Sequence, residues 1–153
     1  MTLFAAMFSV GTIVLKCVEL AATHNIDYRQ LSSEQRQHFM IEAQRTNPTV
    51  TTVHRIVEEP EDVEIRGRHI RLQPGDEVCY PFVCIHQNPQ LFKDPETFRI
   101  ERPAEERDRV LSWSVGPHAC PAKELSILST VVMLDALSER YDLRELRLFN
   151  PEF

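Results

Sequence analysis

The feature that most restricts the fold of this chain is its apolar N-terminus, MTLFAAMFSVGTIVLKCVELAATH. The pattern over residues 3–23 is helical, and for three turns the helix is apolar on nearly every side. Such a helix normally lies inside a large protein, whereas this chain has 153 residues. Lys16 and Glu19 interrupt the run before it can cross a bilayer, and no basic residue precedes it as in a signal peptide. We therefore expect a buried helix and no transmembrane segment. The compartment is not determined by this pattern, and the cytoplasm is favoured.

Two further helices are predicted from the spacing of apolar residues. The first covers residues 32–46, where Ser32 or Ser33 can cap its start and Pro48 cannot continue its hydrogen-bond ladder. The second covers residues 121–139, because AKELSILSTVVMLDALSERY carries apolar residues at helical spacing. Helices therefore dominate the predicted fold.

A small β-sheet is predicted over residues 50–80. Three β-type segments contribute to it, and Gly67 provides a turn within the second. The third segment, DEVCYPFVCIH, extends the β-type pattern to His86, and a last strand is expected in YDLRELRLF at residues 141–149. The fold class predicted from these elements is mainly α with a small β-sheet, that is, α+β.

The long segment at residues 86–111 has a different character. It contains Pro89, Pro95 and Pro103 between short apolar groups, which indicates turns and single helical turns instead of one long element. A loop of this length inside a compact protein is usually functional.

Composition narrows the class of partner and the chemistry of the cysteines. With 42% hydrophobic and 26% charged residues the chain is typical of a globular protein, and its net charge of −6 argues against a nucleic-acid surface. The four cysteines form no C-x-x-C pair and no disulfide framework, so a reducing compartment is favoured. Any role for a cysteine is then an individual one.

Cys120 is the strongest candidate for such a role. In SWSVGPHACPAKELS it follows a Gly-Pro turn, and Pro121 is well placed for the first position of a helix. The N–H groups of a helix start favour a thiolate, and His118 can add positive charge or a hydrogen bond. From the residues alone, the sulfur can be a nucleophile, a redox centre, a metal ligand or a buried thiol without a role. A zinc site lacks a second ligand pair, and a Cys/His hydrolase is a weak match because both residues share one loop.

Three charged residues are informative only in combination. Glu42 and Arg45 lie three apart on one face of a helix, and such a pair contributes only about 0.2–0.5 kcal/mol when exposed. Arg102 lies in the proline-rich segment, and by itself it is best interpreted as a solvated loop charge. Their order along the chain, ahead of the cysteine loop, is more specific.

Glu-x-x-Arg at a helix end, a small sheet, NPQLFKDPETFRIERP and then SWSVGPHACPA resemble, in this order, the C-terminal third of a cytochrome P450. The family signature F-G-x-G-x-H/R-x-C-x-G aligns with the loop, where Gly116, His118 and Cys120 match outright. The resemblance covers nearly the whole chain. It implies one partial domain over residues 1–153, composed of a distal helix (3–23), a Glu-x-x-Arg helix (32–46), a small sheet (50–80), a meander (86–111), a heme-thiolate loop (112–122) and a proximal helix (121–139).

The resemblance further implies a heme cofactor and assigns residues to it. Cys120 would be the thiolate axial ligand of the heme iron, which is the metal ligand of the family. His118 and Arg55 would contact the heme propionates. Trp113 would pack its ring beneath the porphyrin, and Gly116 would be a further cofactor-binding residue of the loop.

A structural role is implied for the three charged residues. Glu42 and Arg45 fall on the family's Glu-x-x-Arg motif, and Arg102 falls on the meander arginine that completes an ion-pair triad with them. Buried together, these side chains would lock the meander, and removal of one partner would cost about 3–5 kcal/mol.

The N-terminal helix aligns with the distal helix of the family, whose motif Ala/Gly-Gly-x-Asp/Glu-Thr corresponds to AAMFS at residues 5–9. Ser9 keeps the alcohol of an acid–alcohol pair that delivers protons in monooxygenases, but Phe8 replaces the acid. Thr12, one turn further on, can substitute in another register. The loss of the acid suits relatives that rearrange hydroperoxides or use peroxide directly, and fungal fatty-acid oxygenase fusions carry a similar GPHxC loop.

Two glycines of the family signature are replaced in the loop. Ser114 and Ala122 replace glycines, which requires a backbone that avoids strongly positive φ at both positions. Pro121 removes one N–H donor near the sulfur. None of these departures excludes heme.

The expected function follows from the resemblance. Family members are longer, so we expect a fragment or truncated product that lacks an N-terminal partner part and exposes an apolar patch. The predicted activity is heme-thiolate oxidation of a small apolar substrate by a monooxygenase-type oxidoreductase, with a reductase or ferredoxin as electron donor. The alternatives are a peroxide-using or hydroperoxide-isomerising relative, and a catalytically silent remnant.

Overall fold

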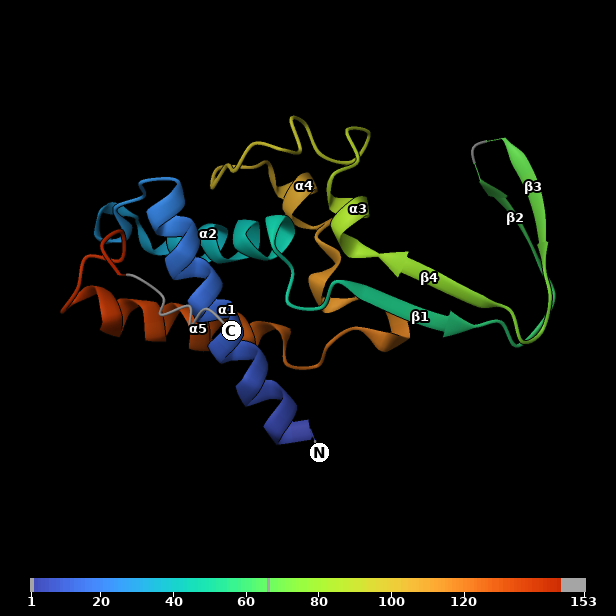
Figure 1. Ribbon diagram of the computed structural model, residues 1–153, viewed down its shortest axis with the longest axis horizontal. Coiled ribbons are helices and arrows are strands. Elements are labelled where there is room, and N and C mark those ends of the chain that lie inside the picture. The colour runs from blue at the N-terminus through green and yellow to red at the C-terminus, as the bar shows by residue number, and fades with distance from the viewer. Residues whose placement is uncertain (1, 66, 147–153) are drawn as a thin grey trace, which may run out of the picture.

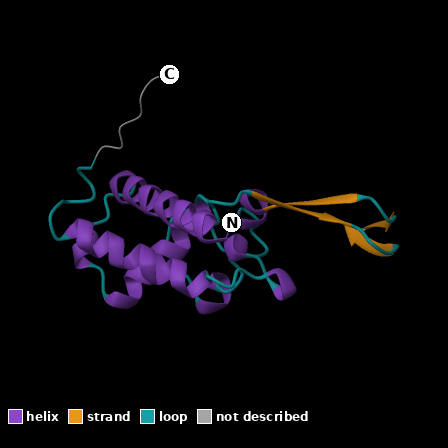
Figure 2. Ribbon diagram, turned by 90° about the horizontal axis from the view of Figure 1, so that it is seen from below, coloured by secondary structure: helices purple, strands orange, loops and turns teal. Residues whose placement is uncertain are grey.

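The computed structural model describes residues 2–65 and 67–146, and it confirms the predicted class of mainly helical structure with small antiparallel sheets (Figure 1). In a second view the helices gather in one body from which the strands extend (Figure 2). The elements in chain order are α1 (Thr2–Thr23), the 3-10 helix η1 (Tyr28–Gln30), α2 (Ser33–Thr46), β1 (Thr52–Ile56), β2 (Glu61–Ile65), β3 (Arg68–Leu72), β4 (Glu77–Pro81), α3 (Phe82–His86), α4 (Ala104–Arg107), η2 (Leu111–Trp113), η3 (Gly116–His118) and α5 (Lys123–Ser138).

The core lies where α1, α2 and α5 contact one another. Apolar side chains from all three helices are buried there: Ile13, Val14, Cys17, Val18, Ala21, Phe39, Met40, Ala43, Ile127 and Leu134. Burial raises the pKa of the Cys17 thiol to about 12, so this cysteine behaves as a small apolar side chain. Helix α1 is buried on one side only, because Phe8 and Leu15 remain 72% and 53% exposed. The expectation of a buried helix therefore holds for its core-facing side, and the expected exposure of apolar side chains is found on the other.

Helix α5 is likewise apolar on two sides. Ile127 and Leu134 point into the core, whereas Leu125, Leu128 and Val132 are more than half exposed. The N-terminal turns of α1 extend beyond the other helices (Figure 1). Over the described residues, none of the helices combines the length and apolar character that crossing a membrane requires.

Both ends of helix α2 are held by hydrogen bonds close to the predicted boundaries. Ser32 and Gln35 form a capping box, in which each side chain accepts a hydrogen bond from the other residue's backbone N–H. At the other end the Lys16 ammonium, on α1, donates to the carbonyl oxygens of Asn47 and Pro48 at 3.2 and 2.9 Å. These bonds join the end of α2 to α1.

The strands form two antiparallel pairs instead of one sheet. β1 pairs with β4, and β2 pairs with β3 in a hairpin that turns at Gly67 with a φ of +73°. The prediction that the third β-type segment continues to His86 is wrong. Pro81 lacks an N–H for a strand partner, and the chain then forms α3, which buries Phe82 and His86 one turn apart.

The predicted strand at residues 141–149 is absent from its described part. Residues 141–146 form a turn, in which the Asp142 carboxylate accepts hydrogen bonds from Arg29 and Arg144. The hydrogen bond from Arg144, above all, holds the pKa of Asp142 well below its ordinary value. Residues 147–149 lie outside the described part of the chain.

Candidate functional site

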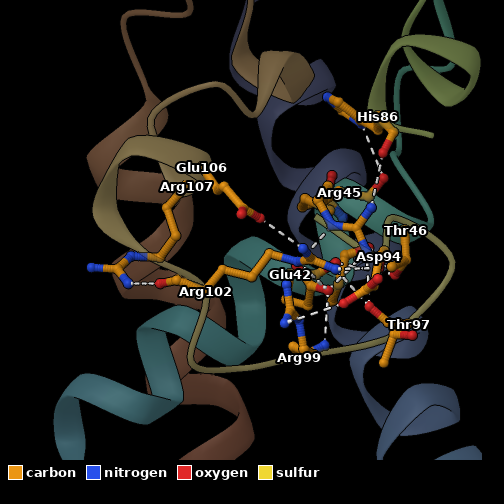
Figure 3. A network of polar contacts seen from close by, with 12 residues as sticks. Glu42, Arg45, Thr46, His86, Asp94, Thr97, Arg99, Arg102, Glu106 and Arg107 are labelled. Carbon is orange, nitrogen blue, oxygen red and sulfur yellow. Dashed lines mark hydrogen bonds and ion pairs between the residues drawn. The ribbon is translucent and has the colours of Figure 1, made fainter. Parts of the chain in front are cut away.

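The C-terminal half of α2 carries a buried ion pair. Glu42 and Arg45 are three residues apart, and their side chains are 3% and 0% exposed. Two nitrogens of Arg45, Nε and Nη2, each donate to one carboxylate oxygen of Glu42 at 2.8 Å (Figure 3). Burial on both sides makes this bidentate pair a structural element of the protein interior rather than a surface pair.

Arg102 joins this pair from the proline-rich segment. Its Nε donates to both carboxylate oxygens of Glu42, at 3.0 and 2.9 Å, and its side chain is 1% exposed. The structure therefore brings the three charged residues together, and the solvated-charge interpretation of Arg102 does not apply. Three of the remaining guanidinium donors bind carbonyl oxygens of the same segment, those of Lys93, Asp94 and Thr97. These contacts hold the loop against α2.

Two members of this cluster were missed by sequence reasoning. Arg102 donates to the Glu106 carboxylate at 2.7 Å, and the backbone N–H of Arg99 donates to Glu42 at 2.9 Å. Burial alone would raise the pKa of Glu106, but the hydrogen bond from Arg102 and nearby positive charge lower it below the ordinary value. The spacing of four residues between Arg102 and Glu106 is the signal that could have identified this pair.

The loop at residues 112–122 begins beside α2. Ser112 donates its hydroxyl to the Gln44 carbonyl at 2.7 Å, and Trp113 is buried with its indole N–H donating to Ser126 Oγ at 2.9 Å. The Lys123 ammonium lies 5.7 Å from the centroid of the Trp113 ring. The tryptophan is thereby fixed against the start of α5.

Two residues of this loop have positive φ. Gly116 has a φ of +67°, which glycine adopts without strain. Ser114 has φ 59° and ψ −176°, a region that is essentially restricted to glycine. The expectation that Ser114 avoids positive φ is therefore wrong, whereas Ala122, with a φ of −102°, satisfies it.

Cys120 is a free and exposed cysteine of this loop. Its backbone N–H donates to the Trp113 carbonyl at 2.7 Å, which closes the loop on itself. Pro121 does not take the first helical position, because α5 begins at Lys123 after Ala122. The cysteine therefore precedes the helix by two further residues. His118 is exposed on the same loop, at the end of η3.

The other predicted site residues lie on α1 and β1. Arg55 is half-buried on β1, and its guanidinium donates to the His54 carbonyl at 2.9 Å. Ser9 is half-buried on α1. The Thr12 hydroxyl donates to the Phe8 carbonyl at 3.0 Å, so the structure ties this alcohol to its own helix.

Comparison of the sequence with models of known protein families shows which family the chain belongs to. The family model described as Cytochrome P450 matches residues 36–151, which include the buried ion-pair cluster and the cysteine loop. The chain belongs to the cytochrome P450 family.

Relatives and solved structures agree with this assignment. A linoleate 10R-lipoxygenase from Aspergillus fumigatus is 30% identical over 113 residues, covering 74% of this chain and 10% of the relative. A cyclooctat-9-en-7-ol 5-monooxygenase from Streptomyces melanosporofaciens is 30% identical over 89 residues, covering 54% of this chain and 19% of the relative. The crystal structure of CYP109E1 from Bacillus megaterium in complex with testosterone matches with a TM-score of 0.77 and 24% identity, over 95% of this chain and 38% of that one.

The matched fractions of the relatives' lengths show how much of a P450 this chain represents. The chain spans less than a third of the length of these two curated relatives and 38% of the CYP109E1 chain. Its fold corresponds to part of the P450 fold. Heme is the cofactor of this family.

The residues of the cysteine loop fit a heme. Among the residues that the structure describes, no three side chains of His, Cys, Asp or Glu gather as ligands for one metal ion. A single exposed thiol suits a metal that receives its other ligands from a porphyrin, and it does not suit tetrahedral zinc. The neighbouring His118 and Gly116 are exposed on the same loop.

Proposed function

We propose that this P450 chain holds heme through Cys120 and takes part in the oxidation of an organic substrate as a heme-thiolate oxidoreductase. One observation carries the proposal: the free thiol of Cys120 is exposed on a loop whose base is bound to α2, through Ser112 and Gln44, next to the buried ion pair. A thiolate ligand must keep one position relative to the porphyrin plane, and a loop fastened to a buried scaffold provides this position.

The chain's own side chains would complete the cofactor contacts. His118 and Arg55 carry the positive charge or N–H donors that bind propionates, and Trp113 supplies an aromatic surface at the base of the loop. Ser9 and Thr12 on α1 are the candidate alcohols of the distal side. When bound, heme supplies the activation of oxygen for transfer of an oxygen atom to a substrate bond.

The finer features of the activity belong to the same proposal. A relative named as a cyclooctat-9-en-7-ol 5-monooxygenase supports monooxygenase-type oxidation of a small apolar molecule. The electron donor would be a reductase or a ferredoxin. A cytoplasmic location, and the division of residues 1–153 into the six segments named above, remain predictions.

The decisive experiment is the carbon monoxide difference spectrum of the reduced, heme-loaded chain. Thiolate ligation gives a strongly red-shifted Soret band, and we expect this band in the wild-type protein. The Cys120→Ser variant should lose it. Cys79→Ser and Cys84→Ser are matched controls, because both thiols are also free and exposed, and both variants should keep the band. A band that survives in Cys120→Ser would overturn the ligand assignment.

A second measurement separates the alternatives. Product formation with a reductase and dioxygen supports monooxygenation. Turnover that occurs only with peroxide would show that the chain uses peroxide and is not a monooxygenase. This result is expected if Phe8 stands at the position of the acid that delivers protons, because a phenyl ring cannot do so. A thiolate band without turnover under either condition would identify a catalytically silent chain.

A further inference from the structure

His86 is a fully buried histidine for which the proposed function names no role. It is the last residue of α3 and is 0% exposed. Its ring stacks on Phe82 at a centroid distance of 6.2 Å and forms a T-shaped pair with Phe92 at a centroid distance of 5.8 Å. A polar ring in such an apolar environment requires hydrogen-bond partners for both nitrogens.

Both nitrogens have such partners, and together they determine the tautomer. The backbone N–H of Leu111 donates to Nε2 at 2.9 Å, so Nε2 carries no proton. The proton therefore resides on Nδ1, which donates to the carbonyl oxygen of Arg45 at 3.0 Å. The neutral ring thus connects the end of α2 to the first residue of η2.

The connection to Arg45 runs in both directions. The Arg45 guanidinium donates to the His86 carbonyl at 2.9 Å, while the imidazole donates to the Arg45 carbonyl (Figure 3). Glu42 orients that same guanidinium by the bidentate pair. His86 is therefore clamped to the buried ion-pair cluster, and its position follows that of the cluster.

The other side of the ring reaches the cysteine loop. Leu111 begins η2, which ends at Trp113, and the Trp113 carbonyl accepts the backbone N–H of Cys120 at 2.7 Å. A path thus leads from Glu42 through Arg45 and His86 to the loop that carries the thiol. It consists of hydrogen bonds and of the three residues of η2.

We propose that His86 is a positioning residue, whose neutral imidazole sets the place of Leu111 and thereby the position of Cys120 relative to the Glu42–Arg45–Arg102 cluster. The role of Cys120 as ligand in this statement rests on the proposed function. Burial lowers the pKa of His86 to about 4, which keeps the ring in the neutral form that accepts from Leu111. The charged groups that face it, Arg45 and Glu42, oppose each other in their effect on that pKa.

Three substitutions separate the two hydrogen bonds from the packing. His86→Gln places an amide oxygen near the position of Nε2 and keeps an acceptor for Leu111. His86→Asn places an amide N–H near Nδ1 and keeps only the donor to Arg45. His86→Phe preserves the ring between Phe82 and Phe92 and removes both bonds. His54→Gln, at an exposed histidine of β1, serves as the matched control.

The first readout is hydrogen exchange of the Leu111 amide in the full chain. We expect exchange about tenfold faster in His86→Asn and His86→Phe, because loss of one net hydrogen bond of about 1.4 kcal/mol corresponds to that factor. His86→Gln and His54→Gln should remain close to wild type. The second readout is the thiolate carbon monoxide band of the heme-loaded proteins, which should weaken in the Asn and Phe variants and persist in the Gln variant.

The outcomes distinguish this inference from the proposed function. Unchanged Leu111 exchange in His86→Phe would overturn the positioning role. Equal losses in the Gln, Asn and Phe variants would also overturn it, because they would show that keeping an acceptor for Leu111 makes no difference. Absence of the thiolate band in the wild-type protein would instead overturn the proposed function, and Leu111 exchange would still show whether His86 holds the loop.

Discussion

Arg102 Nε lies 3.0 and 2.9 Å from the two carboxylate oxygens of Glu42, although 60 residues separate them in the chain. The two side chains are 1% and 3% exposed, so water cannot replace either partner. The contact thus fastens the irregular segment that precedes the cysteine loop to α2.

Replacement of Arg102 by Met should therefore destabilise the chain by about 3–5 kcal/mol, because Glu42 and Glu106 lose their shared buried cation. Urea unfolding followed by circular dichroism measures this change. Asp62→Asn is the control, since it removes the exposed ion pair with Arg71 and should cost about 0–1 kcal/mol. Equal losses in the two variants would contradict the assigned role of the cluster.

Ser114→Gly should stabilise the protein. Its φ of 59° and ψ of −176° lie in the glycine region, where strain of a non-glycine residue costs about 1–3 kcal/mol. Glycine relieves this strain but adds about 0.5–1 kcal/mol of conformational entropy cost, so the expected net gain is about 1 kcal/mol. Thermal unfolding measures it.

Ala122→Gly provides the matched comparison, because Ala122 also stands where the family signature has glycine. Its φ of −102° is unstrained, so the glycine should destabilise the protein by up to about 1 kcal/mol. A loss of stability in both variants would show that Ser114 is not strained.

Ser126→Ala should destabilise the protein by about 1–3 kcal/mol. The substitution leaves the indole N–H of the buried Trp113 without its acceptor, and it also removes the bond from Ser126 to the Lys123 carbonyl. A double-mutant cycle with Trp113→Phe isolates the first contribution. We expect the serine substitution to cost less in the Trp113→Phe background, and full additivity would contradict the hydrogen bond.

Stability should depend on pH through His86. The pKa of this histidine falls from 6.5 to about 4 on folding, chiefly because burial disfavours its charged form. Between pH 6.5 and 4 the unfolded chain therefore binds a proton that the folded chain does not. The neutral His86 therefore contributes fully to the free energy of unfolding above pH 6.5. Below that pH the free energy of unfolding declines by up to about 1.4 kcal/mol per pH unit.

Urea midpoints across that range, measured for the wild type and for His86→Phe, isolate this effect. Glu106 has a lowered pKa and so loses its stabilisation on acidification in both proteins, which cancels in the difference. The stability difference between the two proteins should shrink as the pH falls. A difference that is constant between pH 6.5 and 4 would rule out the buried neutral histidine.

Local sequence signals predicted the parts of the fold that depend on neighbouring residues. Ser32 and Pro48 mark the two ends of α2, because a cap and a missing N–H act within one helical turn. Gly67 turns the β2–β3 hairpin because the required φ belongs to a single residue. The resemblance to the P450 family rests on the order of the Glu-x-x-Arg motif, the proline-rich segment and the cysteine loop, and this order is readable without coordinates.

Signals that depend on distant residues were interpreted incorrectly or missed. Residues 82–86 have a β-type pattern, yet they form α3 because Phe82 and His86 find partners from other segments. Ser114 adopts a glycine-like backbone because the loop must close between Trp113 and Cys120. Neither constraint is visible in a window of a few residues.

The sequence by itself determined the three long helices, the turn at Gly67 and the order of the charged motifs ahead of Cys120. Only the tertiary structure decided that Glu106 and His86 belong with Glu42 and Arg45, and that Leu111 is tied to them. The reason is physical. A propensity acts on the residue that carries it, whereas a buried charge or imidazole is stable only when the folded chain brings a partner from another segment within hydrogen-bond distance.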